Sequence, residues 1–363
     1  MDQPKDEAPK GHTRTRSAVK ATRPRSSTKG PLDLDDPGLP TPTLSLTHLL
    51  SPTLYPPPPA PPLPPSFSLR PPPPTTTPLP TLLTSGLFRL AALSAAHALT
   101  GPTRPHPSDH TTIFRLLYTR LACLALVDPT LAAAEARALD LDAALAADLV
   151  PWGLRVLLVR LQALGDGRRA VMGYYELARE ARGKGWTGRL GDVGVRVAGA
   201  MVEMGDWEGA AGVLAGVGGD TEGVEVMRGL VWLQMGDVEA ARRGAGEGRG
   251  GEVVRALCEM AEGGYEKAVG MWEGLRGGEG GEMVGVNMAV CLLYVGRMQE
   301  GKALLEELVA SGKSSPTLLF NLSTMYELCT ERATALKLEL SETVAAMDGS
   351  LGGWERSNAD FKL

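Results

Sequence analysis

The chain has 363 residues, a formal net charge of −5, 28 prolines and 44 glycines, with only 5% aromatic residues. Twenty-two of the prolines fall at or before Pro80, which separates a Pro-rich arm from a body rich in Ala, Leu, Gly and Glu. All five histidines lie at or before residue 110, so the last 253 residues hold no His-based catalytic or metal centre, although a carboxylate-only mechanism stays open.

The charge is unevenly distributed along the chain. Residues 1–30 carry eight Lys or Arg against three Asp or Glu, and subtracting this +5 from the total leaves −10 on the remainder. An acidic body disfavours nucleic acid as the main partner. The basic segment can contact an anionic membrane or RNA, but a solvated disordered tail is the simpler interpretation.

Cysteine use and hydropathy indicate the compartment. The four cysteines are far apart in sequence and form no CxxC motif, which is typical of a reduced intracellular protein. No apolar run is long enough to span a membrane, and the basic N-terminal residues lack the apolar stretch of a secretory signal. We therefore expect a cytoplasmic protein without a transmembrane helix.

Residues 1–80 are predicted to be a disordered arm, basic at first and then Pro-rich. Runs such as PPPPAPPLPP remove backbone donors and fix φ, so residues 31–80 favour polyproline II. The stretch from Thr53 to Tyr55 and the prolines after it form a possible ligand for an SH3 or WW groove. A plain spacer is the alternative.

Residues 81–150 are predicted to form an N-terminal helical segment. An apolar i, i+3/i+4 stripe runs through residues 81–99, a Pro-rich loop follows at 101–110, and Ser108 or Asp109 is placed to cap a helix over 111–126. Asp128-Pro129 then begins an Ala-rich helix. No segment shows the period-2 alternation of a strand.

Residues 151–363 contain an internal repeat. A glycine recurs with a small residue five positions later, and in four of the five copies an apolar residue precedes the glycine and in four a larger residue lies two positions after it. The copies are LGDGRRA (Gly165, Ala170), MGDWEGA (Gly205, Trp207, Ala210), MGDVEAA (Gly236, Ala241), EGGYEKA (Gly263, Tyr265, Ala268) and VGRMQEG (Gly296, Gly301).

The spacing of the copies predicts the fold. Successive signature glycines are 40, 31, 27 and 33 positions apart. These separations are close to the tetratricopeptide period of about 34 residues. A glycine suits the left-handed position that ends the first helix of each unit, and the small residue lets the second helix approach closely. We predict an all-α, tetratricopeptide-like solenoid of 12 to 14 helices in antiparallel pairs, preceded by the disordered arm.

Catalytic and cofactor motifs are weak or missing. Gly246-x-Gly248-x-x-Gly251 formally matches a dinucleotide fingerprint, but a helix precedes it where a strand is required. The sequence has no P-loop and no GxSxG nucleophile motif. We expect no catalytic residue, no metal site and no cofactor, and we interpret the six widely spaced tryptophans mostly as repeat core.

Three strings carry a family resemblance. They are PWGLR at 151–155 with the VLLVRLQALGD that follows it, VNMAVCLLYVGRMQEGKALLEELV at 286–309 and TLLFNLSTMYELCTERATALK at 317–337. They resemble the C-terminal region of subunit 12 of the transport protein particle (TRAPP) complex. The positions that match its motifs, with no role assigned, are Pro151, Trp152, Arg155, Asn287, Asn321 and Tyr326.

The resemblance implies a function. It implies a non-catalytic scaffold subunit of a tethering complex that supports nucleotide exchange on a Rab GTPase in ER-to-Golgi traffic and autophagy. Expected partners are other subunits, the large ones above all, with the Rab contacted indirectly and membranes of the ER and Golgi touched at most peripherally. The apolar positions of a C-terminal helix, from Leu328 to Val344, could supply one contact.

A tetratricopeptide adaptor that binds short peptide tails is the alternative function. Such a groove clamps a carboxylate with cations on the first helices of its units. Arg155, Arg160 and Arg196 are the candidates, but they are few and lie among Gly and Ala.

Overall fold

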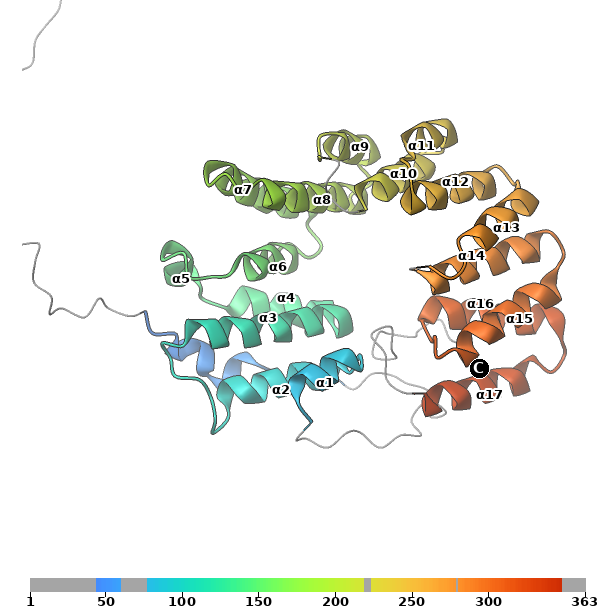
Figure 1. Ribbon diagram of the computed structural model, residues 1–363. Coiled ribbons are helices and arrows are strands. Elements are labelled where there is room, and N and C mark those ends of the chain that lie inside the picture. The colour runs from blue at the N-terminus through green and yellow to red at the C-terminus, as the bar shows by residue number, and fades with distance from the viewer. Residues whose placement is uncertain (1–43, 60–76, 219–222, 279, 348–363) are drawn as a thin grey trace, which may run out of the picture. The chain divides into compact units, whose positions relative to one another are not determined.

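The computed structural model describes residues 44–59, 77–218, 223–278 and 280–347, and their regular structure is helical throughout, without a strand (Figure 1). The all-α prediction is confirmed. The helices are α1 (Leu79–Thr84), α2 (Phe88–Thr100), α3 (His110–Val127), α4 (Pro129–Ala138), α5 (Asp142–Ala146), α6 (Trp152–Gln162), α7 (Gly167–Gly183), α8 (Thr187–Glu203), α9 (Trp207–Ala215), α10 (Val224–Gln234), α11 (Val238–Gly244), α12 (Arg249–Ala261), α13 (Tyr265–Gly274), α14 (Gly281–Tyr294), α15 (Met298–Ala310), α16 (Pro316–Cys329) and α17 (Ala333–Ala346).

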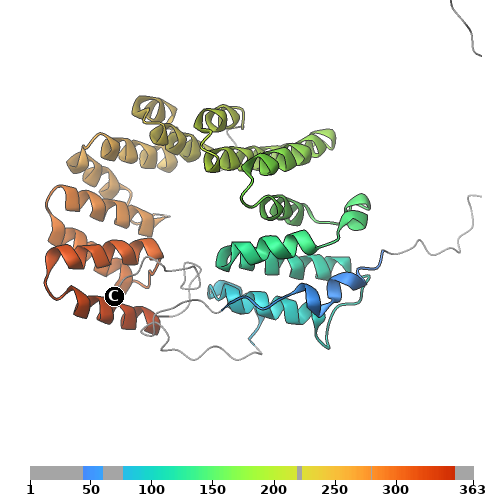
Figure 2. The same cartoon turned by 180° about the vertical axis from the view of Figure 1, so that it is seen from behind.

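From α6 onward the helices form antiparallel pairs joined by short turns, as expected for a tetratricopeptide-like stack. Each helix packs on its neighbours in sequence, as α7 and α8 or α14 and α15 do in both views (Figures 1 and 2). First helices of successive pairs also meet, α10 with α12 and α14 with α16. Each pair therefore buries its apolar side against the next pair, which is how such repeats gain stability.

Aspartates start many of these helices. Asp109 accepts a hydrogen bond from the Thr112 amide at 3.1 Å, so it is the cap of α3 where the sequence left Ser108 as an alternative. Asp166, Asp206 and Asp237 cap the second helices of three pairs in the same way. In the repeat signature, the glycine thus ends one helix and the aspartate after it satisfies an amide of the next.

Three helices that the periodicity predicted as continuous are broken, which gives 17 α-helices among the described residues where 12 to 14 were expected. Gly86 has a left-handed φ of +69° and separates α1 from α2. Leu139 is extended and ends α4, and the extended Thr330 ends α16 before α17. In each case the apolar stripe continues across the break, so periodicity alone could not locate it.

Part of the predicted disordered arm is packed. Residues 44–59 contain two short 3₁₀ turns, Thr47–Leu50 and Pro52–Leu54, and bury Leu46, Leu49, Leu50 and Tyr55. The interpretation of this stretch as a spacer or SH3-type ligand is therefore wrong, because its leucines complete the core of α2 to α4. Residues 1–43 and 60–76, the rest of the arm, lie outside the described residues.

Arg120 on α3 hydrogen-bonds residues 44–59 to the helices. Its fully buried guanidinium donates to both carboxylate oxygens of Glu135, to the Ala92 carbonyl at 3.0 Å and to the Pro56 carbonyl at 2.8 Å. The Tyr55 ring lies 5.2 Å from the guanidinium carbon. Arginine has donors enough for all these acceptors, and a buried charge of this kind is tolerated only when it is paired and hydrogen-bonded.

The hydrophobic core contains many buried residues in the helices near both chain ends and few in the helices between them. One cluster of 26 buried residues runs from Leu46 to Leu161, and one of 22 runs from Val253 to Val344. Between them lie clusters of nine, six and three buried residues. The first cluster crosses the predicted segment boundary at 150/151, because Leu154, Leu158 and Leu161 of α6 pack into it.

None of the described helices is both long enough and apolar enough to cross a membrane.

Candidate interaction surface

The five signature glycines lie in the turns between paired helices. Gly165, Gly205, Gly236, Gly263 and Gly296 all have a positive φ, between +78° and +84°. A side chain would strain the backbone there, so the glycine ends the first helix and reverses the chain at little cost. These residues shape the scaffold and contribute no chemistry.

The small residues of the signature lie where the paired helices touch. Ala170, Ala210, Ala241 and Ala268 are buried on the second helices. A β-carbon on Gly301 would meet the Ala289 carbonyl at 3.1 Å, tighter than an ordinary contact. Trp207 and Tyr265 begin the second helices and are half-buried, and the Tyr265 ring stacks on Tyr294 at 4.4 Å.

The family-motif residues occupy two parts of the chain. Pro151 precedes α6, where Trp152 and Arg155 lie, and Tyr326 is buried in α16 with its pKa raised by desolvation and by Glu306. Asn287 and Asn321 lie one repeat period apart on α14 and α16, and each donates to the carbonyl four positions earlier, at 3.0 and 2.8 Å. Both amides are thus held against their own helices.

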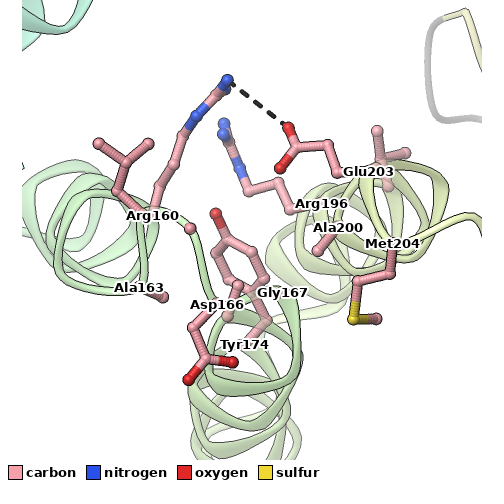
Figure 3. A pocket seen from close by; sticks show the side chains of 14 residues that line it. Arg160, Ala163, Asp166, Gly167, Tyr174, Arg196, Ala200, Glu203 and Met204 are labelled. Atoms are coloured by element: carbon pink, nitrogen blue, oxygen red, sulfur yellow. Dashed lines mark ion pairs between the residues drawn. The ribbon is translucent and has the colours of Figure 1, made fainter. Parts of the chain in front are cut away.

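A groove of about 470 Å³ lies between α6, α7 and α8 (Figure 3). Arg160 of α6 and Arg196 of α8 extend across its mouth, and Tyr174 of α7 points its hydroxyl towards them (Figure 3). Glu203 stands opposite Arg160, with 4.0 Å between the closest nitrogen and oxygen. The groove therefore presents two guanidinium groups and a phenol together with the carboxylates of Glu203 and Asp166, so an anionic group would have to compete with Glu203 for Arg160.

The ring of Tyr174 is buried while its hydroxyl faces these cations. Burial raises the pKa of the phenol, and the nearby Arg196 and Arg160 act in the opposite direction. The phenol thus stays protonated at neutral pH and serves as a hydrogen-bond donor at the base of the groove.

The three cations considered for a carboxylate clamp do not act together. Arg155 is paired with Glu180, both of whose oxygens accept from its guanidinium, one of them at 2.8 Å. Arg196 is paired with Asp192 on its own helix at 3.1 Å. Only Arg160 and Arg196 line the groove, so it holds two of the three candidates.

Glu180 is the carboxylate most strongly affected by these pairs. The hydrogen bond from Arg155 lowers its pKa to about 2, with a further contribution from Lys184. The Lys184 ammonium also contacts Asp148 at 2.8 Å. This network joins α6 to the end of α7 and orients Arg155 away from the groove.

Sequence reasoning missed how the tryptophans are used. Trp272 is fully buried, which fits the core interpretation, but Trp152, Trp186, Trp207 and Trp232 are only half-buried, and Trp354 lies outside the described residues. Trp152 and Trp186 meet edge to face although they are distant in sequence. Their separation, one repeat period, was the available signal.

Cysteines and acidic side chains form no site in the part of the chain that is described. Cys123, Cys258 and Cys291 are buried, and burial raises the pKa of Cys291 to about 11. No three His, Cys, Asp or Glu residues among those described are grouped so that they could hold a metal ion.

Comparison with known proteins gives a short match. No protein-family model matches the chain. Over 66 residues it is 41% identical to trafficking protein particle complex subunit 12 of Mus musculus, and equally to the Homo sapiens protein. The match covers 17% of this chain but only 8% of the mouse and 9% of the human protein, and it confirms the resemblance over that stretch.

A solved tetratricopeptide repeat protein from Parabacteroides merdae aligns with 64% of this chain and 93% of its own, at 14% identity and a TM-score of 0.42.

Proposed function

We propose that this chain is a non-catalytic scaffold subunit of a TRAPP-type tethering complex, which supports Rab nucleotide exchange in ER-to-Golgi traffic and autophagy. The 41% identity with part of subunit 12 is the observation that carries the proposal. The stacked helix pairs agree with it, because such stacks offer extended surfaces for protein contacts. The chain would act in the cytoplasm, next to ER and Golgi membranes.

The last helix pair is our candidate for a subunit contact. Phe320, Leu328 and Leu338 of α16 and α17 are 50%, 53% and 46% exposed, so this pair offers three large apolar side chains for a contact. A permanent interface with a large subunit would bury more than about 2,000 Å². The predicted contact helix is split at Thr330, and of its four apolar positions Leu340 and Val344 are buried, Leu336 is half-buried and Leu328 is exposed.

Purification from the cell of origin tests the proposal. A tagged full-length chain should recover tether subunits in stoichiometric amounts, and recovery of chaperones alone would refute the proposal. Replacing Phe320, Leu328 and Leu338 by serine should remove at least one subunit. The matched control replaces the exposed Met283 and Tyr294 of α14 by serine and should leave recovery unchanged.

The groove between α6 and α8 supports a second candidate, an adaptor for short peptide tails. Arg160 and Arg196 face the same cavity with the Tyr174 hydroxyl, an arrangement that suits a terminal carboxylate. A peptide titration decides between the two functions. Micromolar binding of an isolated C-terminal peptide, lost in Arg160→Ala, favours the adaptor.

A further inference from the structure

Trp152 and Trp186 form an aromatic corner where the first helices of two successive pairs begin. Trp152 is the first residue of α6 and Trp186 precedes α8, and their ring centroids are 5.8 Å apart with the planes at 81°. The turn after α7 holds Trp186 in place, because its amide donates to the Ala181 carbonyl at 2.8 Å. Both rings remain half-buried.

Three cations surround this corner. The guanidinium carbon of Arg189 lies 3.8 Å from the Trp186 ring centroid and 5.0 Å from that of Trp152. The Lys184 ammonium is 4.6 Å from Trp186, and the Arg155 guanidinium is 5.8 Å from Trp152. Stacking on an indole holds a guanidinium by its face and leaves its N–H edge for an anion.

Arg189 differs from the other two cations in its charge partners. Arg155 pairs with Glu180, and Lys184 pairs with both Glu180 and Asp148. Arg189 has no ion pair with any carboxylate that the structure describes. The corner therefore holds three positive charges against the two negative charges of Glu180 and Asp148. The charge left without a partner among the described residues is that of Arg189, which lies against both indole rings.

Two donors beside the rings also lack acceptors. The indole Nε1 of Trp152 and the Nε of Arg155 are buried and make no hydrogen bond within the described residues. A buried donor without an acceptor lowers stability, so native proteins rarely leave two together without a use.

The repeat itself does not require tryptophan at position 152. Trp152 lies 13 positions before its signature glycine, and the same register position holds Asp192, Gly223, Gly250 and Met283 in the other copies. The turns and helices form in those copies as well. One side of the indole packs against the core of α6 to α8, but the repeat does not require an indole there, and the half of the residue left uncovered is available for a partner.

The charge of this region points to the occupant. Residues 150–200 carry nine Lys or Arg against four Asp or Glu, whereas residues 201–363 carry 14 against 26. Tryptophan and arginine are also the residues that most often dominate protein–protein binding energy. A carboxylate beside an apolar side chain would pair with Arg189 and cover the exposed indole surface.

We propose that Trp152, Trp186 and Arg189 form a docking site for an acidic segment of a partner protein, one that presents a carboxylate next to an apolar side chain. This proposal rests on the proposed scaffold function, because it names one surface through which the scaffold would bind a partner. It is separate from the contact proposed for α16 and α17.

Photo-crosslinking in cells tests the site directly. A photoreactive amino acid replaces Thr187, the exposed residue next to Trp186, in the full-length chain, and the cross-linked peptide is sequenced. We expect an acidic segment of one protein partner, and Arg189→Glu should reduce the yield at least tenfold. Arg182→Glu, at an exposed arginine of α7 that has no cation–π contact with either ring, is the matched control and should change it less than twofold.

Several results would overturn the proposal. They are an unchanged yield with Arg189→Glu, cross-links only to a second copy of this chain, and no cross-link at all. Vesicles of phosphatidylcholine and phosphatidylserine in a 4:1 ratio test the membrane alternative, since flotation lost in Arg189→Glu but kept in Arg182→Glu would assign the site to lipid. Arg189→Gln is a second variant of the same residue. A reduced cross-linking yield with an unchanged melting temperature in this variant shows that the loss is not caused by misfolding.

The two proposals fail in distinguishable ways. If the wild-type chain recovers tether subunits and Arg189→Glu loses none of them, the docking site is wrong and the scaffold function stands. If the wild-type chain recovers no tether subunit, but an acidic segment of another protein is mapped at the site and lost in Arg189→Glu, the site stands and the scaffold function is wrong.

Discussion

The helices near the two chain ends and those in the middle follow the same repeat rules but differ in their cores. The clusters around α2 to α6 and α12 to α17 contain 26 and 22 buried residues, with large side chains such as Phe114 and Trp272 fully enclosed. The clusters between them contain nine, six and three, mostly valine and alanine. The same glycine turns therefore occur in the middle helices, where few apolar side chains are buried, and near the chain ends, where many are. The geometry of the turns does not indicate how stable each part is.

The largest expected effect concerns the buried ion pair of the N-terminal core. Arg120→Leu should lower the free energy of unfolding by about 3–5 kcal/mol, because Glu135 would remain buried without its partner. Urea unfolding measures the loss. The double variant Arg120→Leu/Glu135→Leu should recover much of it, and a double variant as unstable as the single one would contradict this account.

Trp272→Ala should cost about 3–5 kcal/mol, because it empties a fully buried site in the C-terminal core. Trp232→Ala, in the thin middle core, should cost about 1–2 kcal/mol, since that ring is only half-buried. Denaturant unfolding of both variants measures the contrast. Equal losses would show that the middle is packed as tightly as the ends.

Two glycines of the middle should respond in opposite directions to the same change. Gly205→Ala should lower stability by about 1 kcal/mol, because the backbone there has a φ of +78°. Gly212→Ala should raise it by about 0.5–1 kcal/mol, because that glycine lies within α9 and a β-carbon would meet nothing within 4 Å. Thermal melting of both variants checks the signs.

The smallest effect is a pH dependence in α7. The folded-state pKa of Glu180 is about 2, below its ordinary value of 4.5, because Arg155 donates to the carboxylate. The stability contributed by this pair is fully present above pH 4.5 and is lost as the pH falls towards 2. Acid titration of stability should therefore be shallower in Glu180→Gln than in the wild type, and parallel curves would contradict the pairing.

The repeat could be predicted from local patterns because its turns need particular residue types. Glycine marks the left-handed turn positions at Gly165 and Gly205, and the spacing places the paired helices. The same reasoning missed the break at Leu139, because a tertiary environment buries a leucine there while the local pattern remains helical. Periodicity reports which face is apolar and does not report where backbone geometry interrupts that face.

The candidate sites were less predictable than the fold. Arg155 and Arg196 were candidates for a carboxylate clamp, but their pairing with Glu180 and Asp192 depends on side-chain contacts that the sequence does not show. The corner of Trp152 and Trp186 needed two successive units brought side by side. The signal for this contact in the sequence is that Trp152 and Trp186 are separated by one repeat period.

The sequence by itself determined that this protein is helical, built from repeated pairs, and without histidine beyond residue 110, because these properties follow from composition and short-range spacing. The tertiary structure decided that residues 44–59 belong to the N-terminal core and that Arg189 lies on two indoles without a described acidic partner. Both depend on contacts between residues distant in the chain. Burial and charge balance at such contacts are set by packing, which no local pattern encodes.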